Sequence, residues 1–161
     1  LALGEAMGLP VPAMIQALTA FPGLPHRTQY VDTVNNVRWY NDSKGTNVGA
    51  TLAAIKGFAS PVVLIAGGVG KGADFTPLAP AVERHARAVV LIGEDAKAIE
   101  EALAGVSPVI HATSMEDAVR KAADVAEHGD AVLLSPACAS MDMFANYGQR
   151  GDVFVEAVKA L

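Results

Sequence analysis

The stretch WYNDSKGTNVGATLAAI, residues 39–55, joins the end of an apolar strand to the start of an apolar, alanine-rich helix. Between the two, residues 41–47 are all polar or glycine. In open α/β sheets, ligands bind beyond the carboxyl ends of the strands, where the free N–H groups and the dipole of a helix N-terminus favour an anion. The stretch therefore predicts an α/β fold with an anion-binding loop at this point. The alternative is that Asp42, Thr46 and Asn47 only shape a turn and cap the helix.

Strand and helix patterns alternate along the rest of the chain. Residues 28–34 and 37–41 alternate around Asn35 and Asn36, which predicts a β-hairpin. Apolar runs predict strands over residues 62–66, 88–92, 109–111 and 131–134, and helical patterns cover residues 47–57, 77–86, 95–104, 114–127 and 151–160. Near-continuous apolar strands are typical of a parallel sheet that is covered on both faces. We therefore expect a doubly wound, mostly parallel, Rossmann-like α/β sheet with an antiparallel edge strand from the N-terminal hairpin.

Two of the predicted helices begin with capping residues. Thr76 followed by Pro77 predicts an N-cap with proline at the first helical position. Ser114 and Asp117 resemble a capping box in which Asp replaces the usual Glu. These pairs define where the second and the fourth predicted helices should begin.

Composition restricts the class of protein. The chain has 161 residues, a net charge of −5 and only 12 Lys and Arg residues, which argues against a general nucleic-acid-binding surface. Its apolar runs are far shorter than the ~20 residues of a membrane-spanning helix, and no signal peptide is visible. The single cysteine, Cys138, cannot form an internal disulfide, which fits a reducing compartment. We therefore expect a cytoplasmic protein without membrane or nucleic-acid partners.

The first 24 residues differ from the rest of the chain. They contain two helical stretches interrupted by glycine and proline, and a connector that places a domain boundary near Pro25. The chain starts inside a helical pattern and without an initiator methionine. We expect a fragment of a longer protein, in which residues 1–24 end one domain and residues 25–161 form the next.

A second loop, residues 67–75, is rich in glycine. Its G-x-G-x-x-A pattern, with Glu94 near the end of the next strand, is the outline of a dinucleotide-binding motif. Lys71 stands in the middle of the loop, where its charge suits a carboxylate or a phosphate better than a packed pyrophosphate turn. A solvated turn is the third interpretation. The residues that match the pattern are Gly68, Gly70 and Ala73.

A third loop, residues 135–148, begins with small residues that would allow a ligand to approach the backbone. Cys138 lies among them, but no histidine pattern supplies a partner base, so we expect a small buried residue rather than a nucleophile. The histidines lack metal-ligand spacing. Polar residues follow in a short helical turn, namely Asp142, Asn146, Gln149 and Arg150.

The three loops together predict one site, because the carboxyl ends of parallel strands meet at the same edge of a sheet. That site would contain Lys44, Thr46, Lys71 and Ser140 together with several backbone amides. Cationic and N–H groups gathered in this way favour a small dicarboxylate or a phosphorylated anion.

Four segments carry a resemblance to a known family. They are FPGLPHR (residues 21–27), NDSKGTN (41–47), AGGVGKGADF (66–75) and LLSPACASMDMFANYGQRG (133–151). In this order and with this spacing, they closely resemble the C-terminal domain of the Mur ligases of peptidoglycan synthesis, and within that family the branch that adds D-glutamate. The likeness covers nearly the whole chain, with residues 1–24 similar to the end of the central ATPase domain and its connector.

The resemblance implies an ATP-dependent, ADP-forming acid–D-amino-acid ligase. ATP would phosphorylate the alanyl carboxylate of UDP-N-acetylmuramoyl-L-alanine, and the amine of D-glutamate would attack the resulting acyl phosphate. The P-loop and the Mg²⁺ ligands of the family belong to the central domain, so the resemblance assigns no catalytic residue and no metal ligand to this chain. We therefore expect the chain to pack against its own central domain and to be inactive alone.

The resemblance also implies two sets of binding residues. The D-glutamate set is Thr46, Lys71, Ser140, Met141 and Tyr147, and the ATP set is His26, Arg27, Asp42 and Lys44. Met141 and Tyr147 stand where one ligase of this branch has Leu and Phe. From spacing alone, an exposed linker pair is the better explanation of His26 and Arg27.

Two alternatives remain open. One is a free-standing dinucleotide-binding or regulatory Rossmann-like module that uses the glycine loop and Glu94. The other is a Mur-type ligase for L-lysine or diaminopimelate, against which the absence of a D-N-P-R sequence argues.

Overall fold

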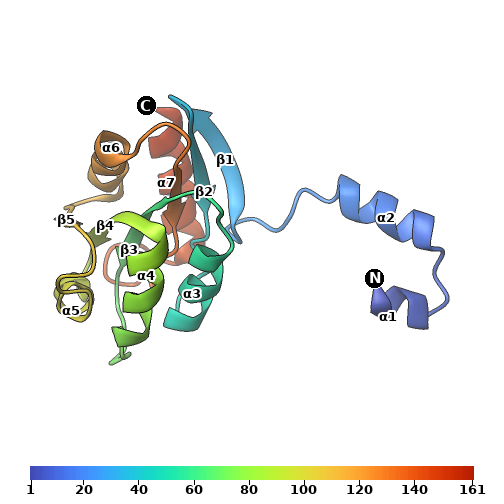
Figure 1. Cartoon of the computed structure of the whole chain (residues 1–161), viewed down its shortest axis with the longest axis horizontal. Helices are drawn as coiled ribbons and strands as arrows, with labels where there is room; N and C mark the ends of the chain where they lie inside the picture. Colours follow the sequence, from blue (N-terminus) through green and yellow to red (C-terminus); the bar gives the residue numbers. More distant parts are fainter.

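The computed structural model describes all residues, 1–161, and shows a six-stranded sheet with helices on both faces (Figure 1). The strand order is β1-β2-β6-β3-β4-β5, in which β1 pairs antiparallel with β2 and every other neighbouring pair is parallel. The strands are β1 (Gln29–Val34), β2 (Val37–Asn41), β3 (Val62–Gly67), β4 (Ala86–Ile92), β5 (Val109–His111) and β6 (Ala131–Leu134). The prediction of a doubly wound, mostly parallel sheet with an antiparallel edge strand is confirmed.

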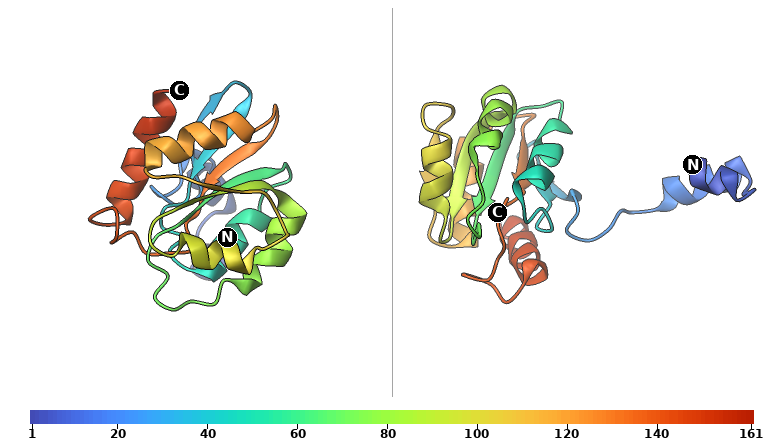
Figure 2. Two further views of the ribbon diagram at one scale, coloured as in Figure 1. Left: turned by 90° about the vertical axis from the view of Figure 1, so that its left-hand side faces the viewer. Right: turned by 90° about the horizontal axis from the view of Figure 1, so that it is seen from below.

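Helices form two separate apolar layers, one on each face of the sheet (Figure 2). The first layer contains α3 (Val48–Lys56), the 3₁₀ turn η1 (Thr76–Leu78), α4 (Ala79–His85) and α5 (Ala96–Ala102), and the second contains α6 (Met115–Val125) and α7 (Tyr147–Lys159). Successive residues of a strand face opposite layers, so Leu64 belongs to the first core and Ile65 to the second. Strands β3 and β6 are buried along their whole length, which explains their uninterrupted apolar sequence.

Strand β6 lies between β2 and β3, and this position determines where the loops meet. Strand β3 leads to α4 on the first face, whereas its neighbour β6 leads to α7 on the second face. Neighbouring strands whose connections leave toward opposite faces mark the place where open α/β sheets bind ligands. The loops after β2, β6 and β3 therefore lie side by side at one edge.

Two predicted helix starts are wrong. Thr76 does not cap a helix, because its N–H and its hydroxyl both donate to Asp74 Oδ1, at 2.9 and 2.7 Å, and a 3₁₀ turn starts there instead. The last helix begins at Tyr147 rather than near residue 151, since Asn146 accepts a hydrogen bond from the Gln149 N–H at 2.9 Å. This cap outweighs the low helix propensity of the two glycines in the first turns of α7.

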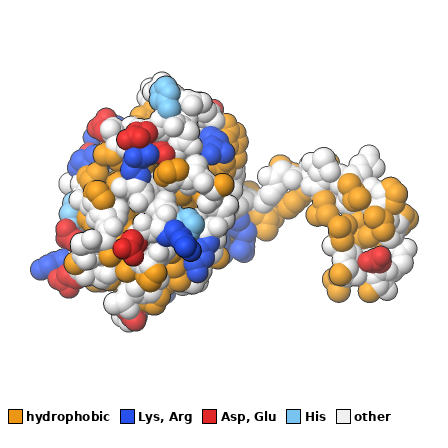
Figure 3. Space-filling view, viewed as in Figure 1, with side chains coloured by type: hydrophobic (Ala, Val, Ile, Leu, Met, Phe, Trp, Pro, Cys, Tyr) orange, Lys and Arg blue, Asp and Glu red, His pale blue; other side chains and the backbone are white.

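The N-terminal helices α1 (Ala2–Ala6) and α2 (Val11–Ala20) lie apart from the sheet (Figures 1 and 2). Neither helix has a buried residue, and Figure 3 shows their hydrophobic side chains on the surface. The large hydrophobic side chains exposed in residues 1–24 are Leu1, Leu3, Met7, Leu9, Val11, Ile15, Leu18, Phe21 and Leu24. Contiguous apolar surface of this kind marks an interaction site. No helix of the chain combines the length and the hydropathy needed to cross a bilayer.

Helix α6 begins at the predicted cap, with one difference. Ser114 Oγ accepts the Asp117 N–H at 3.1 Å, but the Asp117 carboxylate accepts from the N–H of Thr113 (3.0 Å) and not from that of Ser114. The short Asp side chain thus closes the box one residue earlier than a Glu would.

Replacing Ser114 with alanine should lower the free energy of unfolding by about 1 kcal/mol, because the Asp117 N–H then lacks its acceptor. Chemical denaturation of the two chains measures the difference. Ser114→Asn keeps an acceptor oxygen and should stay within a few tenths of a kcal/mol of the original chain. Equal losses in both variants would contradict the capping role.

Candidate functional site

Three loops are hydrogen-bonded to one another at the carboxyl edge of the sheet. Loop 1 is residues 42–47 after β2, loop 2 is residues 68–75 after β3, and loop 3 is residues 135–146 after β6. The Ala137 N–H donates to the Gly45 carbonyl at 3.0 Å, which joins loops 1 and 3. Val69 and Ala139 exchange two backbone hydrogen bonds of 2.9 Å each, which join loops 2 and 3. The predicted convergence of the three loops is therefore present.

Gly68 shows how closely loops 2 and 3 approach each other. Its φ of 122° lies in the region that L-residues avoid, and a Cβ at this position would collide with the carbonyl oxygen of Ala139. Glycine at this position of the loop therefore allows loop 2 to pack directly against the backbone of loop 3. Loop 2 does not have the form of a dinucleotide-binding turn, because no helix starts within it and the Gly70 N–H is occupied by Asp95 Oδ2 at 2.6 Å.

Asp42 connects loop 1 to its surroundings and is only 8% exposed. Its Oδ1 accepts the Thr28 N–H at 3.0 Å, and its Oδ2 accepts the Ser135 hydroxyl at 2.7 Å. Burial raises the pKa of this carboxyl above its ordinary value, although the hydrogen bonds from Ser135 and Thr28 act in the opposite direction. Both carboxylate oxygens are held by the chain itself.

Three of the four residues expected to face ATP line one pocket of about 310 Å³. Its lining residues are Arg27, Thr28, Asp42, Lys44, Gly45, Ala50, Ala53 and Ala54. The helix α3 contributes only alanines, which leave room beside the two cations. Lys44 Nζ also lies 4.0 Å from the centre of the Tyr147 ring, a cation–π contact that ties loop 1 to the start of α7.

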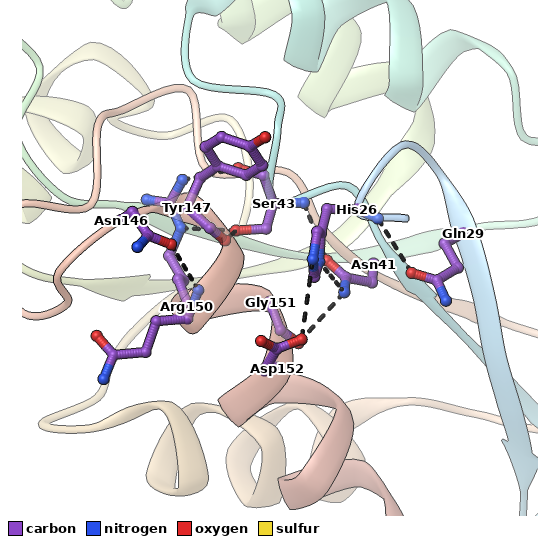
Figure 4. Close-up of polar contacts among 10 residues, drawn as sticks. His26, Gln29, Asn41, Ser43, Asn146, Tyr147, Arg150, Gly151 and Asp152 are labelled. Carbon is purple, nitrogen blue, oxygen red and sulfur yellow. Dashed lines mark hydrogen bonds and ion pairs between the residues drawn. The ribbon is translucent and has the colours of Figure 1, made fainter. Parts of the chain in front are cut away.

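His26, the fourth of these residues, faces α7 instead of the pocket (Figure 4). Its Nδ1 lies 3.0 Å from Asn41 Nδ2. Asn41 Oδ1 accepts the Ser43 N–H, so Nδ2 is the donor, and the proton of a neutral His26 is on Nε2. That Nε2 lies 3.8 Å from Asp152 Oδ1, and the ring packs edge-on against Tyr147.

The residues expected to bind D-glutamate occupy all three loops and the start of α7. Lys71 is exposed near the tip of loop 2, with a φ of 56° and no hydrogen bond or ion pair to its side chain. Ser140 is buried next to the Val69–Ala139 pair, whereas Met141 is 67% exposed. Thr46 follows the Gly45–Ala137 contact, and Tyr147 is the first residue of α7. The loop contacts bring these positions to the same edge, although they line no part of the pocket beside Arg27.

Sequence reasoning missed Arg150 as a central residue of this edge. The side chain is 1% exposed and donates to Ser43 Oγ (3.0 Å), the Ser43 carbonyl (2.9 Å) and the Cys138 carbonyl (3.1 Å), as Figure 4 shows in part. Burial lowers the pKa of Arg150 to about 10, so it remains charged at neutral pH. A signal was present, since Arg150 shares one helical stripe, at spacings of four, with the buried Phe154 and Val158.

Ser43 and Asn41 were also missed as parts of the site. The Ser43 hydroxyl donates to the Tyr147 carbonyl at 2.7 Å and accepts from Arg150. Asn41 Nδ2 reaches the Gly151 carbonyl at 3.2 Å in addition to His26. Both side chains therefore join loop 1 to the first turns of α7.

Cys138 is fully buried, and burial raises the pKa of its thiol to about 12. The expectation of a small buried residue rather than a nucleophile is confirmed. No three His, Cys, Asp or Glu side chains lie close enough together to hold a metal ion.

Comparison with known proteins identifies sequences similar to this chain. The family model described as "Mur ligase, glutamate ligase domain" matches residues 26–138. The UDP-N-acetylmuramoylalanine–D-glutamate ligase of Nitrosococcus oceani is 58% identical over all of this chain and 36% of its own length. The chain thus spans about a third of the length of the curated relatives it matches.

Solved structures with low identity share the fold. The MurF ligase of Thermotoga maritima in complex with ADP has a TM-score of 0.63 and 13% identity, covering 99% of this chain and 36% of its own. The bifunctional folylpolyglutamate synthase/dihydrofolate synthase of Yersinia pestis, complexed with AMPPNP and a Mn ion, has a TM-score of 0.65 and 18% identity, covering 92% of this chain and 34% of its own.

Replacing Asp42 with asparagine should keep the hydrogen-bond geometry and remove a buried charge. Because the folded-state pKa of Asp42 is raised, its contribution to stability is complete below about pH 4 and is lost as the pH rises through the folded pKa. Asp42→Asn should therefore melt at the same or a higher temperature than the original chain at pH 7, with a smaller difference at pH 4. Thermal unfolding followed by circular dichroism measures both.

Ser135→Ala is the matched control, because it leaves Asp42 Oδ2 without its donor and should lower the melting temperature at pH 7. A melting temperature of Asp42→Asn that falls by the same amount at both pH values would contradict the raised pKa.

Proposed function

The chain belongs to the Mur ligase family, and we propose that it is the amino-acid-binding domain of an ATP-dependent ligase that adds D-glutamate to UDP-N-acetylmuramoyl-L-alanine. Residues 25–161 would form this domain, and residues 1–24 would form the end of the preceding ATPase domain and its connector. The exposed apolar surface of α1 and α2 supports this division, because a neighbouring domain would cover it.

One observation carries the proposal. Arg27, Lys44, Lys71 and Arg150 all lie at the carboxyl edge of the sheet, and none of them forms an ion pair within the chain. The chain as a whole has a net charge of −5, and the carboxylates of Asp42 and Asp142 lie at the same edge. Asp42 accepts hydrogen bonds from Thr28 and Ser135, and Asp142 accepts one from the Glu94 N–H, so neither forms an ion pair with these cations. The two carboxylates of D-glutamate and the phosphates of ATP are the anions that such an edge would take.

The two sets of binding residues divide this edge. Thr46, Lys71, Ser140, the Met141 backbone and Tyr147 would hold the carboxylates of D-glutamate. Arg27, Asp42 and Lys44 would meet ATP in the pocket beside α3. His26 lies next to Arg27 in the connector and contacts Tyr147 and Asp152 of α7. Lys44 lies in both neighbourhoods, because it lines the pocket and contacts the Tyr147 ring.

The proposed reaction needs positioning and charge neutralisation from this domain. ATP phosphorylates the alanyl carboxylate, the D-glutamate amine attacks the acyl phosphate, and phosphate leaves. The chain holds the amine donor in place and opposes the negative charge that develops as the amine attacks. Mg²⁺ would support the phosphoryl transfer, but no acidic cluster of this chain fits a metal, so we assign its ligands to the preceding domain. We place the reaction in the cytoplasm, where ATP is available.

A chimeric enzyme tests the proposal. This chain, placed after the preceding residues of the Nitrosococcus oceani relative, should release ADP with UDP-N-acetylmuramoyl-L-alanine and D-glutamate, and not with L-glutamate, L-lysine or diaminopimelate. The unaltered relative serves as the reference. Turnover with another amino acid alone would overturn the substrate, and the isolated chain should form no ADP in the same assay.

Within the chimera, Lys71→Ala should reduce kcat/KM for D-glutamate about 30-fold, the equivalent of roughly 2 kcal/mol for a lost charge-assisted contact. The melting temperature should stay unchanged, since Lys71 is exposed and pairs with nothing. Lys56→Ala, at an exposed lysine at the end of α3, is the control and should leave turnover unaffected. Unchanged turnover in Lys71→Ala would remove this residue from the site.

A further inference from the structure

Arg150 is the one fully buried cation of the site, and it forms no ion pair, although the charge of Asp142 acts on it from a longer distance. Buried guanidinium groups are costly unless they are paired and fully hydrogen-bonded. Arg150 bonds instead to neutral acceptors, two on Ser43 and one on Cys138. An apolar side chain would fill the same stripe of α7 without this cost. The arrangement therefore calls for a role beyond core packing.

The three acceptors belong to two different loops. Ser43 is in loop 1, directly before Lys44 and three residues before Thr46. Cys138 is in loop 3, two residues before Ser140. The planar guanidinium, which has donors in a rigid fork, thus fixes how far the two loops lie from each other. Its other end is anchored in α7, whose first carbonyl, that of Tyr147, accepts the Ser43 hydroxyl.

We propose that Arg150 is a positioning residue that sets the distance between loop 1 and loop 3. It thereby determines how tightly Thr46 and Ser140 together bind a dicarboxylate amino acid. The inference rests on the proposed function for the identity of that ligand. It assigns Arg150 no contact with the substrate. It also predicts that a ligand spanning both loops depends on Arg150 more than ATP does, because the residues proposed to contact ATP all come from the connector and loop 1, so ATP need not bridge the two loops.

The test compares two arginine-to-lysine substitutions. Arg150→Lys keeps the charge but loses the fork, since an ammonium group cannot reach two carbonyls and a hydroxyl in fixed directions. Arg87→Lys is the matched control, because Arg87 bonds Asp130 at the opposite end of the sheet, where β4 and β6 begin. Each variant is made in this chain, for thermal unfolding and amide hydrogen exchange, and in the chimera, for kcat and the KM values of D-glutamate and ATP.

In Arg150→Lys, we expect the Ala137 amide, which bonds Gly45 across the two loops, to exchange at least tenfold faster. The KM for D-glutamate should rise at least tenfold and the KM for ATP less than threefold. Arg87→Lys should lower the melting temperature while both KM values stay within twofold.

Two results would overturn the proposal. One is an Arg150→Lys variant with unchanged Ala137 exchange and an unchanged KM for D-glutamate. The other is a parallel rise of both KM values that Arg87→Lys reproduces, which would show a structural role only. If the chimera does not use D-glutamate at all, the proposed function fails, and the exchange of Ala137 still decides whether Arg150 holds the loops together.

Ser43→Ala covers the case in which Arg150→Lys does not fold. It removes the hydroxyl between Arg150 Nε and the Tyr147 carbonyl and leaves the guanidinium in place. A rise of about threefold in the KM for D-glutamate, without a matching rise for ATP, is expected. An unchanged KM would contradict the proposal.

Discussion

The insertion of β6 between β2 and β3 is the constraint on which the site depends. Parallel pairing on both sides, with Trp39 opposite Val132 and Leu64 opposite Leu133, places the ends of three strands next to one another. A fully buried strand has no freedom to slip, because a shift of one residue would send its apolar side chains to the wrong layers. The packing of the core therefore holds the loops that follow these strands at one edge of the sheet.

Charge is distributed differently at the two ends of this sheet. At the amino ends of the strands, Arg87 is paired with Asp130 and Glu127. Burial alone would raise the pKa of Asp130, but hydrogen bonds from Arg87 and from the Glu127 N–H hold it below its usual value. At the carboxyl ends, Lys44 and Lys71 have no such partners. Charges are thus paired at the amino ends of the strands, where they stabilise the fold. Lysine side chains are free of ion pairs at the carboxyl ends, where anions are proposed to bind.

Carboxyl and hydroxyl groups at the carboxyl edge serve mainly to hold the loops. Asp42 is bonded to Thr28 and Ser135, and Ser43 is bonded to Arg150 and Tyr147. These contacts arrange a surface on which the exposed groups can act. Preorganisation of this kind removes from binding the entropic cost of ordering the loops. It also explains how short polar loops of ordinary composition can form a defined site.

The sequence by itself determined the order and type of the strands and helices, the hairpin around Asn35 and the likeness to the Mur ligases, because periodicity, turn residues and local motifs are short-range properties. It also placed Thr46, Lys71 and Ser140 at one edge, since the rule for parallel strands needs only the strand ends. Only the tertiary structure decided that Thr76 does not cap a helix, that α7 begins at Tyr147, and that Arg150 is buried between two loops. The first two outcomes rest on local hydrogen bonds, from Thr76 to Asp74 and from Gln149 to Asn146, which the folded loops select among several that the sequence permits. The third depends on Ser43, a partner 107 residues away, and no local pattern contains that pairing.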